Sequence, residues 1–514
     1  MKIIRIIAIV AAFGLVGVFC ISSLESINQD IGRHLKTGEI IWQTKHVPST
    51  NLFSFTEPNT PFINHHWFSE VVFYLLNLKI GLPGLIVFKA AIFLLVFALL
   101  YLAVSSKVTP LSFVVALMAA LLAIGDRTDL RPEIFSYLAM ACFLFAIFRA
   151  KYNGQYRWLY YLPLVELFWA NMHIYFPFGI ALMGLFALDR LIIGDKRWKK
   201  VAWITAACAA VILINPNGLA GAMAPFTILQ NYGYSIVENQ SLIFLKDYGV
   251  LVQQINVFVL VTVVFFLSFI PRWKKWGIRS YIFESSAGLV FAILAMMMVR
   301  NVGPFAIIMA PILALNLEAY WPQKESMVKY DLAIGLCILF AIGVIGGPFS
   351  DLIEPHDRFG LSIPAGAQGG VDFVLNNHLR GPVFNNFDVG SYLIWKLYPD
   401  QQVFVDGRPE AYTVNFFEDI YKPMQEDPQV WQHYADDVYH INYIFFDFHD
   451  ITPWARMFLT SISTDPNWPL VYHDGSVVIF VRRTPQNMPL IQQFSEHGIQ
   501  LPLLWRDLAA KKFL

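Results

Sequence analysis

The sequence predicts a polytopic α-helical membrane protein that carries a smaller α/β domain at its C-terminal end. Of its 514 residues, 56% are hydrophobic and only 14% are charged, and the mean hydropathy is +0.52. This composition is too apolar for a water-soluble protein and is typical of a chain that crosses a bilayer repeatedly. Near residue 350 the long apolar runs give way to short ones. We therefore expect a membrane domain over residues 1–349 and an exported α/β domain over residues 350–514.

The apolar runs number about eleven, and several of the shorter ones need interfacial residues to complete a crossing. They cover residues 3–24, 83–104, 111–125, 134–149, 158–171, 174–193, 200–214, 255–271, 283–299, 304–320 and 331–347. The first run exceeds the apolar part of a usual signal peptide and is followed by no clear small-residue cleavage motif. We expect it to stay as an uncleaved anchor.

Clusters of Lys and Arg predict the orientation in the membrane. With the N-terminus in the cytoplasm, every basic cluster between the predicted spans also falls in the cytoplasm, as the positive-inside rule requires. These clusters lie at residues 107, 149–157, 196–200, 272–279 and 324–329. An odd number of spans then places the loop at residues 25–82 and the C-terminal domain on the external, periplasmic side of a cell (inner) membrane.

Charge and cysteine content limit the partners. The formal net charge is +0 at pH 7, and nucleic-acid binding needs a concentrated basic surface, so we expect no nucleic-acid partner. All the cysteines, Cys20, Cys142, Cys208 and Cys337, lie in apolar runs. Neither a structural disulfide nor a Cys-based zinc site is therefore predicted.

The first external loop begins with Asp30, Arg33 and His34, which share one face of a helix because they are three and four residues apart. We expect this short helix to end at Gly38. A carboxylate at Asp30 suits a general base for a hydroxyl group, and cationic partners suit a phosphate leaving group. The alternative is a helix cap and salt bridge that only hold the loop. We favour the functional interpretation because a loop beside lipid has other ways to anchor itself.

The same loop contains the adjacent pair His65 and His66, followed by Glu70 in a predicted surface helix over residues 65–78. His66 and Glu70 are four residues apart and face the same direction. Two adjacent histidines are compatible with a metal site, but the spacing is not that of a zinc protease and no cysteine completes a structural site. We favour polar contacts with substrate or with the rest of the loop.

The second external loop carries Asp126 and Asp129 together with Arg131. Paired carboxylates suit a divalent cation that bridges to a phosphate, and Arg131 suits a direct contact with the same phosphate. A self-neutralising cluster of acids and arginines is an equally good interpretation. Further along, Arg300 lies at the outer end of an apolar run. Its side chain either holds the phosphate of a lipid-linked donor or extends to the phosphates of membrane lipids.

The C-terminal domain shows a β-α-β pattern with strands expected at residues 382–386, 402–406 and 443–448. Two further β-rich runs, joined by Asp474 and Gly475, predict a hairpin. Polar residues end the first two strands, where α/β domains place ligand groups. Neither GxGxxG nor GxxxxGK[ST] occurs, so we expect no nucleotide site. Docking onto the membrane domain or acceptor recognition is the expected role.

Several motifs together resemble a known superfamily. They are DIGRHLKTGEI, VPSTNLFSFT, HHWFSE, RPEIFSYL, WANMH, INPNG and VFVDGRPEAY. With the order of first span, acidic external loop, many spans and exported domain, the chain resembles the GT-C glycosyltransferases that use polyprenyl-phosphate-linked sugars. More narrowly, it resembles a bacterial branch related to the mannosyltransferase and aminoarabinose-transferase type. The resemblance extends over nearly the whole chain.

The resemblance implies that Asp30 is the catalytic base or positions the acceptor, and that Asp126 and Asp129 occupy the place of an acidic pair without forming an Asp-x-Asp motif. It implies inverting sugar transfer from a polyprenyl-phosphate-linked donor to a lipid, glycan or protein acceptor, with a divalent metal ion as the one cofactor to consider. Two alternatives remain: a transporter or flippase of a lipid-linked saccharide, and a non-catalytic envelope assembly protein. The charges cluster at the external ends of the spans, which favours the enzyme over the transporter.

Overall fold

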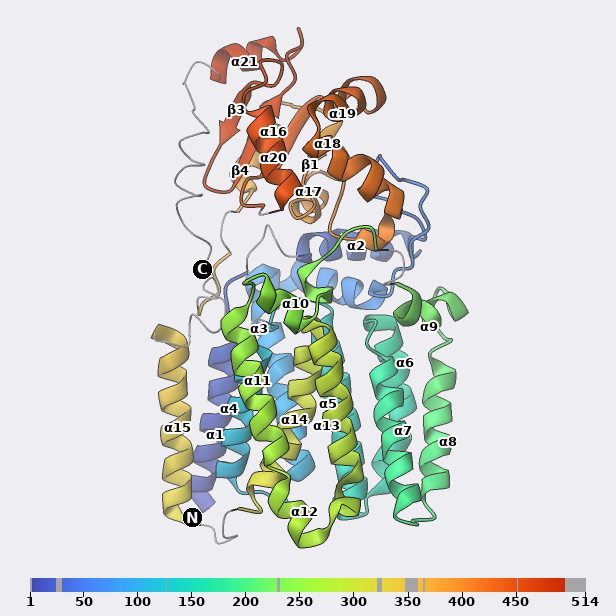
Figure 1. The fold of residues 1–514 in the computed structure, drawn as a ribbon, viewed down its shortest axis with the longest axis vertical. Helices are drawn as coiled ribbons and strands as arrows, with labels where there is room; N and C mark the ends of the chain where they lie inside the picture. Colours follow the sequence, from blue (N-terminus) through green and yellow to red (C-terminus); the bar gives the residue numbers. More distant parts are fainter. Residues whose placement is uncertain are drawn as a thin grey trace.

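The computed structural model describes residues 2–24, 30–125, 127–228, 232–320, 326–346, 359–363, 366–450 and 452–494. Long helices form a bundle, and the C-terminal α/β domain lies over one end of it (Figure 1). Between the two lies α2 (Ile31–Thr44), which crosses the end of the bundle. The boundary predicted between residues 349 and 350 is outside the described residues.

Each predicted apolar run overlaps an α-helix. The helices of the bundle and its edges are α1 (Lys2–Cys20), α3 (Trp67–Val104), α4 (Pro110–Ile124), α5 (Glu133–Asn153), α6 (Leu162–Met172), α7 (Pro177–Ile192), α8 (Trp198–Val211), α9 (Gly218–Thr227), α10 (Leu242–Asp247), α11 (Val252–Leu267), α12 (Ile270–Trp276), α13 (Ile282–Met297), α14 (Val302–Leu317) and α15 (Met327–Gly346). In the part of the chain that the structure describes, seven helical segments are long and apolar enough to cross a membrane, and α4 is a shorter apolar helix. The total of eleven crossings stays a prediction.

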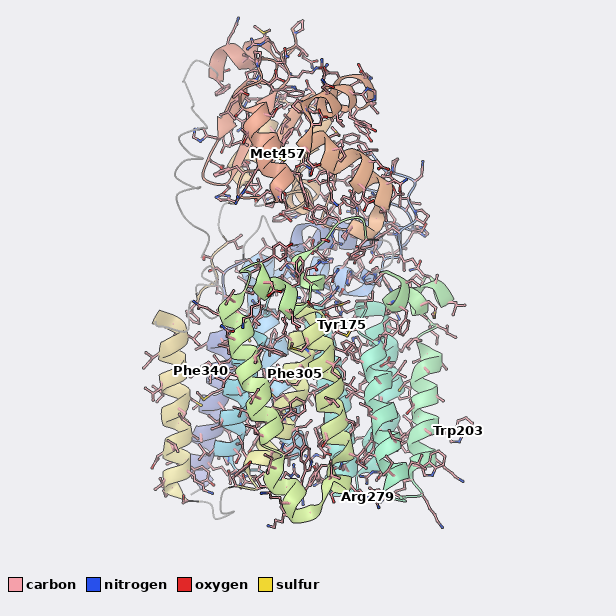
Figure 2. The ribbon with its side chains drawn as sticks, in the orientation of Figure 1. Tyr175, Trp203, Arg279, Phe305, Phe340 and Met457 are labelled. Atoms are coloured by element: carbon pink, nitrogen blue, oxygen red, sulfur yellow. The ribbon has the colours of Figure 1, made fainter. Side chains whose placement is uncertain are left out.

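Burial divides these helices into an inner and an outer group. The inner helix α14 packs against α4, α5 and α13, and Phe305 on it is fully buried. Trp203 on α8 is 78% exposed and projects from the outer surface, as Figure 2 shows. Apolar side chains exposed over a whole helix face indicate contact with lipid rather than water. The protein is therefore a multi-pass membrane protein.

The surface helix and the second span predicted from the sequence form one element, α3, with a break between them. At Gly81 the backbone has φ 65° and ψ −178°, which interrupts the helix just before Pro83. Glycine adopts this positive φ without the steric cost of a Cβ. The arm of α3 before the break packs against α2, and the arm after it packs in the bundle.

The predicted end of the helix that starts after Asp30 was wrong. α2 continues through Gly38 to Thr44, and Lys45, with φ 58°, ends it. Gly38 does not end the helix but leaves room for α3, because a Cβ there would overlap the carbonyl oxygen of Glu70. The glycine lets α2 and α3 approach closely, which brings the polar faces of the two helices together.

The C-terminal domain contains a mixed sheet in the order β1-β2-β4-β3. Its strands are β1 (Val383–Asn385), β2 (Tyr443–Asp447), β3 (Leu470–His473) and β4 (Val477–Val481). β1 and β2 are parallel, the other pairs are antiparallel, and the hairpin predicted at Asp474 and Gly475 is confirmed. The helices of the domain are α16 (Gln368–Asn376), α17 (Gly390–Leu397), α18 (Lys422–Glu426), α19 (Pro428–Gln432), α20 (Pro453–Ile462) and α21 (Met488–Phe494).

Successive residues of β2 point into two different apolar cores, one on each face of the sheet. Ile444 and Phe446 belong to one core, and Tyr443 and Phe445 belong to the other. A strand buried on both faces is apolar at every position, as the sequence of β2 is. The sheet therefore forms the middle layer of the domain.

The strand predicted at residues 402–406 was wrong. Within that segment Val403 forms a single parallel bridge, and its partner is Ser54 of the first external loop rather than a strand of the sheet. The same loop donates a hydrogen bond from Asn51 Nδ2 to the carbonyl of Ala411 (3.0 Å) and accepts one from Arg408 at Asn51 Oδ1 (2.8 Å). The loop that contains Asn51 and Ser54 is thus also a structural part of the C-terminal domain.

Candidate active site

A cavity of ≈ 320 Å³ lies at the junction between the helical bundle and the C-terminal domain. Segments that are far apart in sequence line it: the start of α2, the second external loop, the segment before α10 and three loops of the C-terminal domain. The lining residues are Asp30, Arg131, Tyr234, Ser235, Ile236, Val237, Glu238, Phe387, Asp388, Gly407, Asp447, His449, Asp450 and Thr452. Carboxylates and a guanidinium group dominate this surface.

Asp30 lies directly before α2, and its side chain does not cap the helix. Ser391 on α17 donates a hydrogen bond to Asp30 Oδ1 (3.2 Å), and an Arg33 nitrogen lies 3.4 Å from the same oxygen. A Cβ on Gly407 would lie 2.8 Å from Asp30 Oδ1, so a larger residue there would displace the carboxylate. The packing of α17 on α2 therefore holds the Asp30 carboxylate at the cavity wall.

The charge state of Asp30 follows from its neighbours. Burial alone would raise the pKa of the carboxyl, but the positive charges of Arg33 and Arg131 lower it below its usual value. Asp30 is therefore ionised at neutral pH. An ionised carboxylate beside a cavity is able to accept a proton or to orient a cationic or hydroxylic group.

Arg131 reaches the cavity from the second external loop and is held by acids on both sides. It forms an ion pair with Glu238, and its Nε lies 3.6 Å from Asp129. Arg127 also contacts Glu238 (3.0 Å), and it binds Glu133 (3.2 Å). Burial would raise the pKa of Glu238, but these arginines lower it. Two carboxylates thus hold the Arg131 guanidinium in place at the cavity.

Glu238 comes from the 3₁₀ turn η3 (Val237–Asn239), which the C-terminal domain holds in place. Just before the turn, Tyr234 stacks on Phe387 with ring centroids 4.2 Å apart. The carbonyl of the adjacent Gly233 accepts a hydrogen bond from Lys422 Nζ (3.0 Å). Glu238 was not predicted as a site residue, because a single acid in a segment without periodicity carries no signal of its partners.

Asp388 faces Asp30 from the C-terminal domain, together with Asp447 and Asp450. The Asp388 side chain is exposed at the cavity wall. Desolvation by the surrounding protein atoms, with the charges of Asp450, Asp447 and Asp30, raises the pKa of Asp388 to about 7. The cavity therefore holds two carboxyl groups with opposite pKa shifts, one ionised and one close to its midpoint at neutral pH.

Behind Asp30, the residues predicted as phosphate and substrate contacts form a hydrogen-bonded network. His34 Nδ1 lies 2.9 Å from Glu70 Oε1, and Asn64 donates to the other oxygen of that carboxylate (2.6 Å). Arg33 lies 3.8 Å from Glu70. Burial and the charge of Arg33 lower the pKa of His34. His34 is therefore neutral at pH 7 and supplies a hydrogen bond rather than the positive charge expected of it.

His65 and His66 belong to a cluster of buried rings rather than to the cavity wall. His66 lies 4.0 Å from His65 and 5.3 Å from His173, measured between ring centroids. Burial lowers the pKa of His65 to about 4, so the ring is neutral. Glu70 does not pair with His66, because His34 and Asn64 occupy its oxygens.

The predicted metal site is not seen among the described residues. Asp129 is close to Arg131, and Asp126 is outside the described residues. Throughout the described ranges, no three His, Cys, Asp or Glu side chains are grouped so that they could hold a metal. Asp129 pairs with Arg131, as expected for a self-neutralising cluster of acids and arginines.

Arg300 lies outside the cavity. In the turn η5 (Val299–Asn301), its Nε donates to the hydroxyl of Tyr175 (2.9 Å) and another of its nitrogens donates to Asn239 Oδ1 (3.0 Å). Asn239 follows Glu238 directly. Arg300 therefore supports the turn that carries Glu238, and of Arg300 and Arg131 only Arg131 lines the cavity with Asp30.

An open apolar groove of ≈ 460 Å³ lies between the first arm of α3, α6 and the turn after α8. Its lining residues are Trp67, Phe68, Leu167, Phe168, Asn171, Ile214, Asn215 and Pro216. The indole of Trp67 donates to Asn171 Oδ1 (2.9 Å), and Asn171 donates to the carbonyl of Ile214 (2.9 Å). These bonds tie the three elements together and leave aromatic faces toward the groove.

Comparison with known proteins gives matches in structure only. No protein-family model and no curated sequence matches the chain. The archaeal oligosaccharyltransferase AglB from Archaeoglobus fulgidus, in complex with an inhibitory peptide and a dolichol-phosphate, aligns with a TM-score of 0.60 and 11% identity over 94% of this chain and 75% of its own. The same organism's oligosaccharyltransferase in complex with Zn and sulfate aligns with a TM-score of 0.54 and 12% identity, covering 93% and 73%.

ArnT from Cupriavidus metallidurans in the apo state matches nearly end to end. It aligns with a TM-score of 0.56 and 11% identity, and the alignment covers 93% of this chain and 97% of ArnT. At identities this low the alignments establish the fold. This protein therefore shares its fold with AglB and ArnT, as the resemblance to the GT-C glycosyltransferases predicted.

Proposed function

We propose that this protein is a glycosyltransferase that moves a sugar from a polyprenyl-phosphate-linked donor to an acceptor at the external face of the membrane. The cavity at the junction of the two domains carries the proposal, because it combines the ionised Asp30 with the fixed cation Arg131. A carboxylate and a cation in the wall of one cavity suit a reaction in which a hydroxyl loses a proton and a phosphate gains charge. The GT-C fold supports the same reaction class.

The proposed step is a single displacement that inverts the anomeric carbon. A bond forms between the acceptor oxygen and the anomeric carbon while the bond from that carbon to the phosphate oxygen breaks. The acceptor proton moves to Asp30, and the electron pair of the broken bond leaves with the polyprenyl phosphate, which Arg131 stabilises. Glu238 holds Arg131 in position for this contact. The lipid, glycan or protein nature of the acceptor is not specified by these groups.

The apolar groove beside Trp67 supports a donor with a lipid tail. A chain of contacts leads from the groove toward the cavity. His66 directly precedes Trp67, and the ring of His66 lies 5.5 Å from the ring of His34. His34 is hydrogen-bonded to Glu70, which lies beside Arg33. A polyprenyl chain in the groove would keep its phosphate at the level of these polar groups. The dolichol-phosphate in the AglB structure is a ligand of the same chemical type.

The proposal includes the orientation predicted from the basic clusters: an N-terminus in the cytoplasm and a C-terminal domain in the periplasm of a cell (inner) membrane. A reporter that is active only outside the cytoplasm should be active when it is fused after residue 514. Activity of a cytoplasm-specific reporter at that position would contradict both the orientation and the external site.

The decisive experiment supplies purified protein in lipid nanodiscs with a panel of polyprenyl-phosphate-linked sugars and lipid, glycan and peptide acceptors. Asp30→Asn should lower the transfer rate about 10²- to 10⁴-fold, because it removes the proton acceptor while keeping the shape. Glu39→Gln is the matched control, since Glu39 lies on the same α2 helix, where it pairs with Lys36. The control should keep full activity, and its product should have an inverted anomeric carbon by NMR.

Two results would contradict the proposed function. One is unchanged transfer by Asp30→Asn. The other is a retained anomeric configuration, which would require a covalent intermediate that a single displacement does not form.

A further inference from the structure

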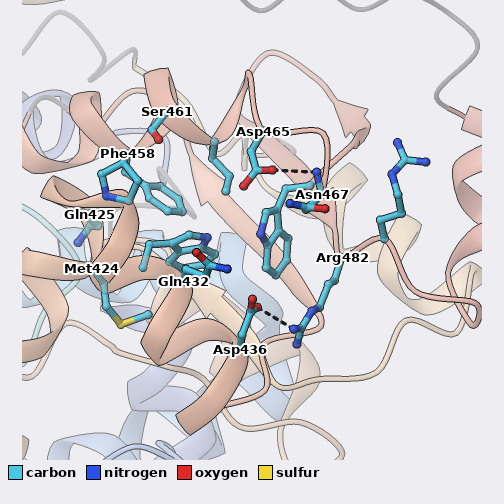
Figure 3. Close-up of a pocket in the computed structure, with 14 residues that line it drawn as sticks. Met424, Gln425, Gln432, Asp436, Phe458, Ser461, Asp465, Asn467 and Arg482 are labelled. Carbon is cyan, nitrogen blue, oxygen red and sulfur yellow. Dashed lines mark hydrogen bonds and ion pairs between the residues drawn. The ribbon is translucent and has the colours of Figure 1, made fainter.

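A second cavity, of ≈ 450 Å³, lies inside the C-terminal domain and shares no lining residue with the Asp30 cavity (Figure 3). Helices α18, α19 and α20 and the segments next to β3 and β4 surround it. Its lining residues are Met424, Gln425, Pro428, Trp431, Gln432, Asp436, Phe458, Ser461, Ile462, Asp465, Asn467, Trp468, Arg482 and Arg483. The function proposed above makes no use of this cavity.

One wall of the cavity is aromatic. The ring of Trp431 lies 4.8 Å from that of Phe458 and 5.3 Å from that of Trp468, measured between centroids. Such packed rings form a rigid apolar surface that also carries an indole N–H donor. The C–H face of a sugar ring suits such a surface, and its hydroxyls suit the polar groups around it.

Two polar atoms at this wall are unpaired. Trp431 is 5% exposed and Gln425 is 2% exposed, and among the described residues neither Trp431 Nε1 nor Gln425 Oε1 has a hydrogen-bond partner. The amide nitrogen of Gln425 is bound to the carbonyl of Tyr421 (3.0 Å), which leaves the oxygen as its free acceptor. Buried polar groups are rarely left unpaired. Because Trp431 and Gln425 both line the cavity, an unpaired donor and an unpaired acceptor lie beside it.

The rim carries charges of both signs in equal number, Asp436 and Asp465 against Arg482 and Arg483. Asp436 binds Arg482 (2.7 Å) on one side, and on another side the backbone N–H of Asn467 donates to Asp465 Oδ1 (2.8 Å), as Figure 3 shows. The amide of Gln432 points into the space between them. A rim that is balanced in this way favours a neutral ligand over an anion or a cation. A hydroxyl group is neutral and is both donor and acceptor.

We propose that this cavity binds a neutral saccharide, and that the saccharide is the part of a glycan acceptor that is remote from the reacting hydroxyl. The second half of the proposal rests on the function proposed above. Helix α20 connects the two cavities, since Thr452 at its start lines the Asp30 cavity and Ser461 and Ile462 at its end line this one. Ten helical residues span about 15 Å, a distance that a short oligosaccharide bridges.

Calorimetric titration of the full chain in nanodiscs tests the site. The probes are maltotetraose, mannotetraose and N-acetylchitotetraose, with a neutral tetrapeptide as the competing chemistry. We expect saturable binding of at least one saccharide and none of the peptide. Trp431→Phe keeps an aromatic ring and removes the N–H. It should raise the dissociation constant about three- to tenfold. Trp203→Phe, on the lipid-facing side of α8, should bind as the natural protein does.

Gln432→Ala provides a second variant at an exposed position, where misfolding is not expected, and it should also weaken saccharide binding. The site is overturned if no saccharide binds, if the peptide binds instead, or if both cavity variants bind as the natural protein does. The Asp30→Asn variant should keep saccharide binding. Binding without any sugar transfer would therefore contradict the proposed function alone, and transfer without saccharide binding would contradict this site alone.

Discussion

Two networks of buried charges lie at opposite ends of the helical bundle. At the end remote from the C-terminal domain, Lys151 donates to Asp189 (2.9 Å) and to Glu284 (2.6 Å), and all three side chains are at most 5% exposed. The Tyr152 hydroxyl also binds Glu284, and the backbone N–H of Phe283 donates to Asp189 (3.1 Å). This network is closed, since protein groups occupy its charges.

The network around Asp30 and Arg131 uses the same types of residue but opens onto a cavity of ≈ 320 Å³. Its members come from both domains, and the Asp388 carboxylate retains contact with solvent. The comparison shows that buried charge alone does not identify a site. A closed network holds helices together, whereas a network with one side left open is able to receive a ligand.

The largest effect on stability is expected in the closed network. Lys151→Met leaves the buried carboxylate of Glu284 without its cation, while Asp189 keeps its ion pair with Arg190. The change should lower the free energy of unfolding by roughly 3–5 kcal/mol. Denaturant unfolding in detergent measures this change. The turnover number of the protein that remains folded should be unchanged, and a specific loss of turnover would show that this network also takes part in the reaction.

A smaller effect, confined to catalysis, is expected in the open network. Arg131→Gln removes a charge-assisted contact with the leaving phosphate and should lower kcat/KM about 10- to 100-fold. The unfolding midpoint should change little compared with Lys151→Met. Arg380→Gln, at an exposed position of the C-terminal domain, serves as the control. Equal activity of Arg131→Gln and Arg380→Gln would show that Arg131 does not contribute to catalysis.

The smallest effect is a pH dependence from Asp388, whose pKa is raised to about 7. Below pH 7 this carboxyl is neutral, and above pH 7 it adds a negative charge to the cavity that receives the donor phosphate. KM for the donor should therefore rise a few-fold between pH 6 and pH 8, while the lowered pKa of Asp30 keeps that group ionised throughout.

Asp388→Asn should give a KM that stays constant over this range. A KM that still rises above pH 7 in the variant would place the titrating group elsewhere. Measuring initial rates at several donor concentrations separates this effect from any change in kcat.

Local patterns in the sequence predicted most elements of the fold. Apolar runs depend on neighbouring residues only, so each predicted run overlaps a helix, and the hairpin at Asp474 and Gly475 followed from turn chemistry. The errors occurred where a distant segment decides the structure. Gly38 is explained by the carbonyl of Glu70, and Val403 pairs with Ser54 rather than with the sheet.

The sequence by itself determined that the chain is a multi-pass membrane protein and that Asp30 and Arg131 lie in polar loops between apolar helices. Only the tertiary structure decided that these two residues share a cavity, that Arg300 does not, and that Glu238 and Asp388 complete the wall. The reason is that helix periodicity is a property of residues a few positions apart. The position of a charge in a cavity depends on how α2, α17 and the turn at Glu238 pack, and that packing joins residues hundreds of positions apart.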